Sequence, residues 1–190
     1  GVYTAGLLAM APATLVDASL QRASNGRLRL ADAHGSVWAG LAQLEVRDAA
    51  GRIGVAKTVS WRVLPESMWR GRLICELELN QSTVKRFPVA LSLSQIEISD
   101  ADIEFPAIGL SIGIAQLAPL RLTGDVLLHI SSLTIGRNEL RGNATLQWRT
   151  AGSALSPVSP LGNYEVRLDG EGPVVHISLR TLQGPLQLDG

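Results

Sequence analysis

The sequence predicts a mainly β protein, an antiparallel meander curled into an open barrel or half-pipe, preceded by one N-terminal α-helix. Apolar and polar residues alternate with period two in a series of short segments after Gly26, which is the pattern of strands with one buried and one solvated face. The connections between these segments are mostly too short to hold crossover helices, so neighbouring strands are expected to pair antiparallel. We expect roughly ten to twelve strands.

The composition bounds the possible functions. The chain has 190 residues, of which 46% are hydrophobic and 18% charged, and this composition excludes a disordered tail. Its 17 basic residues balance its 17 acidic residues, which removes the electrostatic argument for binding nucleic acid or an anionic membrane surface. Because Cys75 is the single cysteine, an internal disulfide and a multi-cysteine zinc site are both excluded.

One helix is expected at about residues 12–25. Pro12 suits its first turn, and the Asn25-Gly26 pair supplies a left-handed stop. Residues 1–16 carry no charge, but as a helix they reach only about 24 Å, which is short of a membrane crossing. This segment is therefore either the outer end of a membrane anchor or an ordinary apolar helix.

The alternating segments follow in order along the chain. They are Leu28–Leu30, Leu44–Val46, Ile53–Val63, Leu73–Leu79, Val89–Leu93, Ile96–Ile98, Ile103–Phe105, Leu120–Leu122, Val126–Ile130, Ala144–Trp148, Tyr164–Leu168, Val175–Leu179 and Leu186–Leu188. Three stretches stand apart from the alternation. Leu64–Arg70 can form one helical turn that begins at Pro65, Pro106–Leu117 is either a strand or a short helix, and Ala151–Asn163 is the longest expected loop.

A weak internal repeat accompanies the strands. Leucines alternate with glycine in Leu120–Gly124, Leu140–Gly142 and Leu182–Gly190. Glycine inside a strand often marks a bulge or a bend, and repeated bends would curl the meander. The alternative is that these common residues recur by chance.

One motif resembles a catalytic signature. Residues 109–113 match G-x-S-x-G, the motif that exposes a nucleophilic serine between a strand and a helix in α/β-hydrolases. The residues that would complete a triad are Asp125 or Asp169 and His129 or His176. However, the chain lacks the alternating strands and helices of that fold. We therefore expect Ser111 on the polar face of an edge segment, without a catalytic role.

The remaining reactive residues indicate no site. His34, His129 and His176 are isolated from one another in the sequence, and the last two fall on the polar parity of their strands. Cys75 falls on the apolar parity, where a thiol packs as a small hydrophobic group. Asp100 and Asp102 lie next to an expected turn and are expected to be solvated. Since no phosphate or dinucleotide motif is present in the sequence, we expect no catalytic residue, no metal and no cofactor.

Tryptophans close to glycines form a more specific pattern. The blocks are G-x-x-W-x-G at 35–40, W-x-x-x-P at 61–65, G-x-x-x-x-x-W at 142–148, L-G-x-Y at 161–164 and G-P-L at 184–186. Their principal residues are Gly35, Trp38, Gly40, Trp61, Gly142, Trp148, Gly162, Gly184 and Pro185. In this order, and after the opening helix, the blocks resemble type II secretion system protein N of the general secretory pathway across essentially the whole chain.

The resemblance implies a non-enzymatic accessory component of the bacterial type II secretion system. It implies a single-pass inner-membrane protein, with the end of the anchor in residues 1–25 and a periplasmic β domain in residues 26–190. It also implies that the native chain continues past Gly190. The expected partners are other secretion components in the periplasm and inner membrane. The family supplies no catalytic residues to carry over.

Two functions remain open at this stage. The first is assembly, in which an unpaired strand edge docks other parts of the apparatus. The second is lipid handling, because a curled sheet with an apolar inner face resembles the groove of AsmA-like proteins. The tryptophans themselves are either core anchors of a fold poor in aromatic residues or part of a partner-binding surface.

Overall fold

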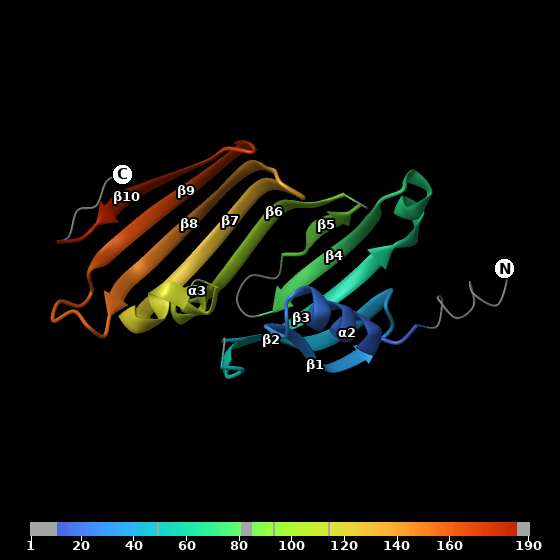
Figure 1. The fold of residues 1–190 in the computed structure, drawn as a ribbon, viewed down its shortest axis with the longest axis horizontal. Coiled ribbons are helices and arrows are strands. Elements are labelled where there is room, and N and C mark those ends of the chain that lie inside the picture. Colours follow the sequence, from blue (N-terminus) through green and yellow to red (C-terminus); the bar gives the residue numbers. More distant parts are fainter. Residues whose placement is uncertain (1–10, 49, 81–84, 93, 114, 186–190) are drawn as a thin grey trace. The chain divides into compact units, whose positions relative to one another are not determined.

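The structure is a computed structural model that describes residues 11–48, 50–80, 85–92, 94–113 and 115–185. Within these residues, ten strands form one antiparallel sheet whose strand order follows the chain order from β1 to β10 (Figure 1). The sheet is open, since β1 and β10 stand at the two ends of that order and each has one neighbour. The predicted antiparallel meander with an N-terminal helix is therefore confirmed, and its open form excludes a closed barrel.

The chain divides into two compact units, Gly1–Arg86 and Phe87–Gly190. The elements of the first unit are α2 (Thr14–Ala23), β1 (Leu28–Gly35), β2 (Ala39–Arg47), β3 (Ile53–Leu64), the 3-10 helix η1 (Pro65–Arg70) and β4 (Leu73–Asn80). Those of the second are β5 (Phe87–Leu91), β6 (Gln95–Pro106), α3 (Ile108–Gly113), the 3-10 helix η2 (Ala115–Leu120), β7 (Leu122–Gly136), β8 (Leu140–Ser153), β9 (Gly162–Gly172) and β10 (Val175–Gln183).

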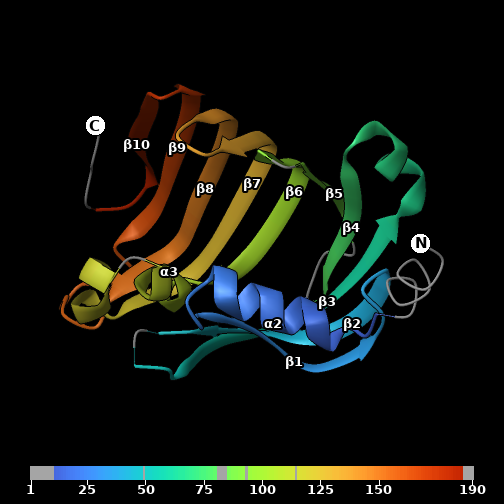
Figure 2. The ribbon, with the colours of Figure 1, turned by 45° about the vertical axis from the view of Figure 1, so that its right-hand side comes forward.

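In the first unit, α2 lies against the sheet and closes its core (Figure 2). The buried residues beneath it come from β1, β2 and β3, namely Leu30, Ala42, Val59 and Trp61. The Asp17 side chain accepts a hydrogen bond of 2.7 Å from the backbone N–H of Leu30, which fixes the helix to β1. The helix ends where predicted, because Asn25 and Gly26 have φ values of 52° and 76°.

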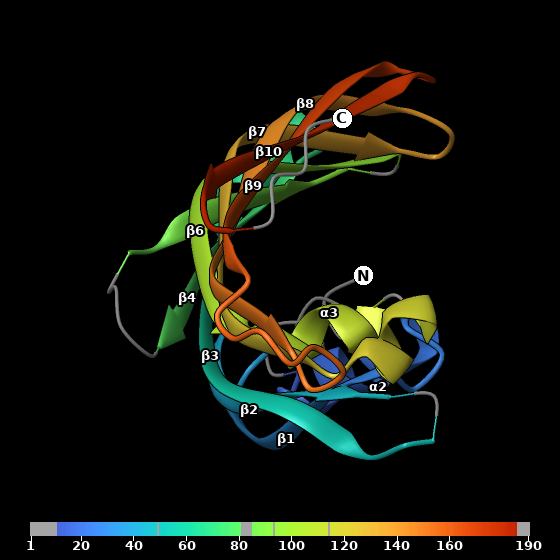
Figure 3. The same ribbon diagram turned by 90° about the vertical axis from the view of Figure 1, so that its left-hand side faces the viewer.

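In the second unit, α3 and η2 fold against the sheet formed by β6, β7 and β8 (Figure 3). Ala107, Leu122 and Val126 are buried at this contact, and Leu110 and Leu117 of the helical segment pack against them. The stretch Pro106–Leu117, which the alternation left undecided, is therefore mostly helical. Because η2 runs to Leu120, β7 begins only at Leu122.

Several boundaries differ from the expectation for local reasons. Ile96–Ile98 and Ile103–Phe105 belong to one strand, β6. Asp100 has a left-handed φ of 50°, and the apolar positions change there from even to odd numbers, which makes one strand look like two. The stretch Ala151–Asn163 is not a loop throughout, because β8 extends to Ser153 and β9 begins at Gly162. The predicted turn at Leu64–Arg70 is confirmed as η1, whereas the expected strand Leu186–Leu188 lies outside the described residues.

Candidate functional site

Trp61 anchors the glycine–tryptophan cluster of the first unit. Its side chain on β3 is 7% exposed and lies against Gly40, the residue paired with it on β2. The indole Nε1–H donates to the backbone carbonyls of Ser36 and Val37, each at 3.2 Å. A Cβ atom at position 40 would collide with the indole ring, so the close approach of the two strands requires glycine there.

Gly35 and Trp38 shape the turn that precedes β2. Gly35 has a left-handed φ of 97°, and a Cβ atom there would collide with the carbonyl oxygen of Ala39. The Trp38 side chain is half-buried, and its carbonyl accepts a hydrogen bond of 2.6 Å from the N–H of Val63. The turn is thus tied to β3 through the Trp61 indole and through the backbone N–H of Val63.

Trp148 has a comparable position in the second unit. Its Nε1–H on β8 donates to the carbonyl of Thr123 at 2.9 Å, and its ring centre lies 6.0 Å from that of Tyr164 at an interplanar angle of 46°. Trp148 has the same parity as buried Ala144 and would be expected to be buried with it, but its side chain is only half-buried. It packs at the margin of the core beneath α3 and not at its centre.

The last glycine blocks bring two backbones together. Gly162 and Gly184 have φ values of 141° and 150°, and a Cβ atom at position 184 would lie 2.6 Å from the Cα of Gly162. The Tyr164 hydroxyl donates to the carbonyl of Leu161 at 3.1 Å, which closes the turn before β9. Gly142 has a φ of 109° beside the carbonyl of Ser132. Pro185 is exposed at the end of the described residues.

The comparison with protein families covers nearly the whole chain. Residues 26–190 match the family model described as type II secretion system (T2SS), protein N. The chain belongs to this family. The resemblance inferred from the glycine–tryptophan blocks is thereby confirmed, and the matched region contains all nine residues of those blocks. Comparisons with curated proteins and with solved structures gave no match.

In this protein N family member, Ser111 is not where the sequence placed it. The G-x-S-x-G stretch forms α3 and no strand edge. The Ser111 Oγ atom is buried and has no hydrogen-bond partner among the described residues. The correction follows from packing, because the segment folds over buried Ala107 and Val126. No described histidine lies within hydrogen-bond distance of this hydroxyl, so the triad with His129 or His176 that the motif would require does not form.

A different serine, histidine and aspartate do come together in this chain. Asp102 on β6 pairs directly with His129 on β7, and His129 Nδ1 lies 2.6 Å from an Asp102 carboxylate oxygen. Ser131 Oγ lies 3.3 Å from His129 Nε2. The side chains of His129 and Asp102 are 45% and 29% exposed, so the group lies on the solvated face. The expected polar parity is correct, but the strand register that pairs His129 with Asp102 cannot be read from local sequence.

The other reactive residues of this family member do not assemble into a site. His34 and His176 are exposed. Cys75 is half-buried against the core of the first unit, and burial raises the pKa of its thiol. This agrees with the predicted packing role, although burial is incomplete. Among the described residues, no three histidine, cysteine or acidic side chains gather as a metal site, and no helix is long and apolar enough to cross a membrane.

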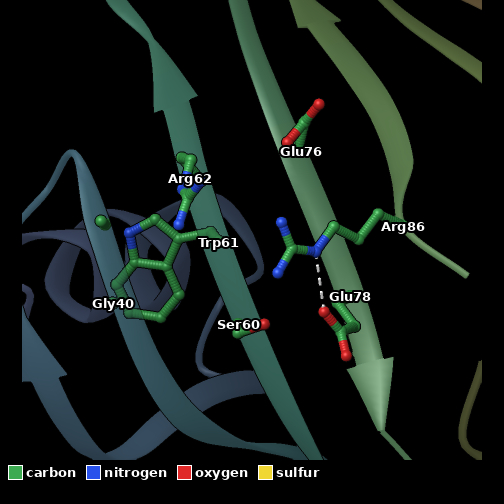
Figure 4. A pocket seen from close by; sticks show the side chains of 8 residues that line it. Gly40, Ser60, Trp61, Arg62, Glu76, Glu78 and Arg86 are labelled. Carbon is green, nitrogen blue, oxygen red and sulfur yellow. Dashed lines mark hydrogen bonds and ion pairs between the residues drawn. The ribbon is translucent and has the colours of Figure 1, made fainter. Parts of the chain in front are cut away.

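A hollow with charged and apolar lining lies over β2, β3 and β4 (Figure 4). It has a volume of about 200 Å³, and two arginines and two glutamates contribute to its lining: Arg62, Glu76, Glu78 and Arg86. Arg86 Nε and a Glu78 carboxylate oxygen form an ion pair at 2.9 Å. The two positive and two negative formal charges of this lining balance.

The outer edge of β10 is an exposed and apolar feature of this chain. Ile177 and Val175 on β10 are 65% and 40% exposed. The N–H of Glu171 donates to the carbonyl of Val174 at the turn before β10. Hydrogen-bonded and non-hydrogen-bonded residue pairs alternate along an antiparallel ladder. Glu171 and Val174 are a hydrogen-bonded pair, and the pair of Leu168 and Ile177 lies three pairs further along the ladder. By this alternation, Leu168 and Ile177 are a non-hydrogen-bonded pair. The backbone N–H of Ile177 therefore points away from β9, toward the edge with which no described strand pairs.

Proposed function

We propose that this chain is a non-enzymatic assembly component of the type II secretion apparatus. The observation that carries the proposal is the family match over residues 26–190. In this proposal the N-terminal segment 1–25 contains the end of an inner-membrane anchor, and the β domain 26–190 works in the periplasm. Its partners are other secretion components of the periplasm and inner membrane, and it needs no cofactor.

The edge of β10 that no described strand covers supports docking by strand addition. An edge strand presents backbone donors and acceptors that a partner strand can pair with. The exposed side chains of Val175 and Ile177 would add apolar contact on alternate positions. The outward N–H of Ile177 makes the idea testable, because proline there removes one outward donor while the hydrogen bonds to β9 remain.

The test is an export assay in the native host lacking its own copy of the gene. We expect Ile177→Pro to fold, to capture fewer secretion components and to lower export of type II substrates. Ile177→Ala is the matched control, since it shortens the side chain and keeps the N–H. Ser178→Pro controls for damage to the ladder with β9, because its N–H points inward by the same alternation.

The same assay separates assembly from catalysis. We expect Ser111→Ala, Ser131→Ala and His129→Ala to leave export unchanged. If a folded Ser131→Ala or His129→Ala protein lost export while Ile177→Pro retained it, the assembly proposal would be replaced by a catalytic one.

An apolar row in the second unit favours lipid binding as a second candidate function. Five aliphatic side chains are paired in register across five strands, and each is only half-buried. They are Ile103, Leu128, Leu146, Val166 and Leu179. Lipid retained by the purified protein, and lost when Leu128 and Leu146 are changed to Ser in a protein that still folds, would support this candidate. Purification free of lipid would oppose it.

A further inference from the structure

One tryptophan differs from the other three. The side chain of Trp69 in η1 is 94% exposed, and that of Met68 beside it is 50% exposed. Trp61 is buried, whereas Trp38 and Trp148 are half-buried. Exposing a whole indole to water is costly because aromatic side chains have a large apolar area. The position of Trp69 is the feature of this unit that most needs a partner.

Hydrogen bonds fix the conformation of the η1 turn that carries Trp69. η1 connects β3 to β4 and forms the closed end, or tip, of their hairpin (Figures 1 and 2). The buried Ser67 hydroxyl donates to the carbonyl of Leu64 at 2.6 Å and accepts from the N–H of Ile74 at 2.9 Å. Gly71 ends the turn with a left-handed φ of 67°. Trp69 and Met68 are therefore held outward by a fixed turn.

Positive charge lies beside the exposed apolar pair. Residues 64–74 contain Arg70 and Arg72 and one acid, Glu66, so two positive charges less one negative charge leave +1. Both arginines are exposed, and Arg70 has no ion-pair partner among the described residues. The turn is thus positively charged although the whole chain has no net charge. The absence of net charge therefore does not remove the electrostatic argument for anionic surfaces at this turn.

A hollow of about 440 Å³ lies against the same turn. Leu64, Pro65 and Ile74 supply apolar lining, and the charged lining residues are Arg70, Arg72 and the single acid Glu66. An amphipathic molecule with an anionic head and an apolar tail matches this combination of surfaces.

We propose that the tip of the β3–β4 hairpin, residues 64–74, contacts an anionic lipid bilayer. Trp69 and Met68 enter the interfacial region, and Arg70 and Arg72 bind lipid phosphates. Tryptophan and arginine both suit this boundary, since each joins an apolar body to a polar end.

The shape of the tip favours a membrane over a protein. A stable protein interface buries about 800 Å² on each partner, whereas a six-residue turn that protrudes from a hairpin offers a small convex surface. Insertion into a fluid interface does not need such an area. The proposal uses a different segment from the docking edge of β10, so either can fail without the other.

The test is co-sedimentation of the full chain with vesicles of phosphatidylcholine and phosphatidylglycerol, compared with vesicles of phosphatidylcholine alone. We expect preferential binding to the anionic vesicles. Trp69→Ala and Arg70→Glu should each weaken that binding about tenfold or more, as expected for the loss of one buried aromatic group or the reversal of one contact charge. The matched controls in the second unit, Leu155→Ala (67% exposed) and Arg137→Glu, should leave it unchanged.

A spectroscopic measurement distinguishes insertion of Trp69 into the bilayer from nonspecific adsorption of the protein to vesicles. Brominated acyl chains should quench part of the tryptophan fluorescence of the unaltered protein. Trp69→Phe should abolish that quenching while retaining much of the vesicle binding, because phenylalanine is apolar but does not contribute indole emission.

Three results would overturn the proposal. The first is no binding to anionic vesicles. The second is binding that Trp69→Ala and Arg70→Glu leave intact. The third is that the unaltered protein binds no lipid and the Trp69→Ala variant captures fewer protein partners than the unaltered protein does. That result would show that the tip contacts a protein. All variants change exposed side chains, so their thermal midpoints should match that of the unaltered protein.

Discussion

Replacing Gly40 with alanine tests the packing of the first unit most directly. The new Cβ atom would meet Cζ2 of Trp61 and would lie 2.7 Å from both Trp61 Cη2 and the carbonyl oxygen of His34. Contacts this short force the indole to move. Trp61 is 7% exposed and packs in the core beneath α2, together with Leu30, Ala42 and Val59, so it has little room.

The free-energy cost follows from two effects. Overpacking a filled core costs about 1–3 kcal/mol. Loss of the indole hydrogen bonds to Ser36 and Val37 adds about 1 kcal/mol. Alanine recovers at most about 1 kcal/mol because it is less flexible than glycine in the unfolded chain. The clash therefore dominates, and the free energy of unfolding should fall by about 1–4 kcal/mol.

The measurement is urea unfolding followed by tryptophan fluorescence and circular dichroism. Gly136→Ala is the matched control, because the three atoms nearest to its Cβ atom all belong to the Glu139 side chain, the nearest at 2.8 Å, and Glu139 is exposed and can move. The double variant Gly40→Ala with Trp61→Phe should lose less than the sum of the two single variants, since the smaller ring leaves space for the methyl group. An unchanged unfolding midpoint for Gly40→Ala, or strictly additive losses, would refute the account of this contact.

Three further predictions concern single side chains. Trp148→Ala should lower the free energy of unfolding by about 2 kcal/mol, below the range for a fully buried tryptophan, because the ring is half-buried and loses one hydrogen bond to Thr123; denaturant titration checks this, and a loss above 4 kcal/mol would contradict it. Ser111→Ala should leave stability unchanged or raise it by up to about 1 kcal/mol, because it removes a buried hydroxyl that makes no hydrogen bond; a lower thermal midpoint would show that this hydroxyl has a partner. Cys75 should react slowly with iodoacetamide near neutral pH, because burial raises the pKa of its thiol and the thiolate is the nucleophile. The contribution of this raised pKa to stability is complete below the pKa of the unfolded thiol and is lost as pH rises through the folded pKa. Cys75→Ala should therefore remove that loss of stability in alkaline unfolding titrations.

Local sequence patterns determined the class of fold and the family. Alternation with period two predicted most of the strands, because a strand places successive side chains on opposite faces whatever lies around it. The helix stop at Asn25-Gly26 and the turn at Pro65 could be predicted for the same kind of reason, since they depend on backbone preferences of the residues themselves. The ordered glycine–tryptophan blocks were enough to indicate the protein N family, which the match over residues 26–190 confirms.

Tertiary structure decided which of these residues are buried and which meet. Ser111 was assigned to a wet strand face, yet packing over Ala107 and Val126 folds its segment into α3. Asp102 meets His129 only because β6 and β7 pair in one register, and a register joins residues that are far apart in the sequence. Trp61 and Trp69 are both tryptophans near a helical turn. One is enclosed by a helix and the other stands on the tip of a hairpin, a difference that comes from contacts made by distant parts of the chain and not from the sequence around either residue.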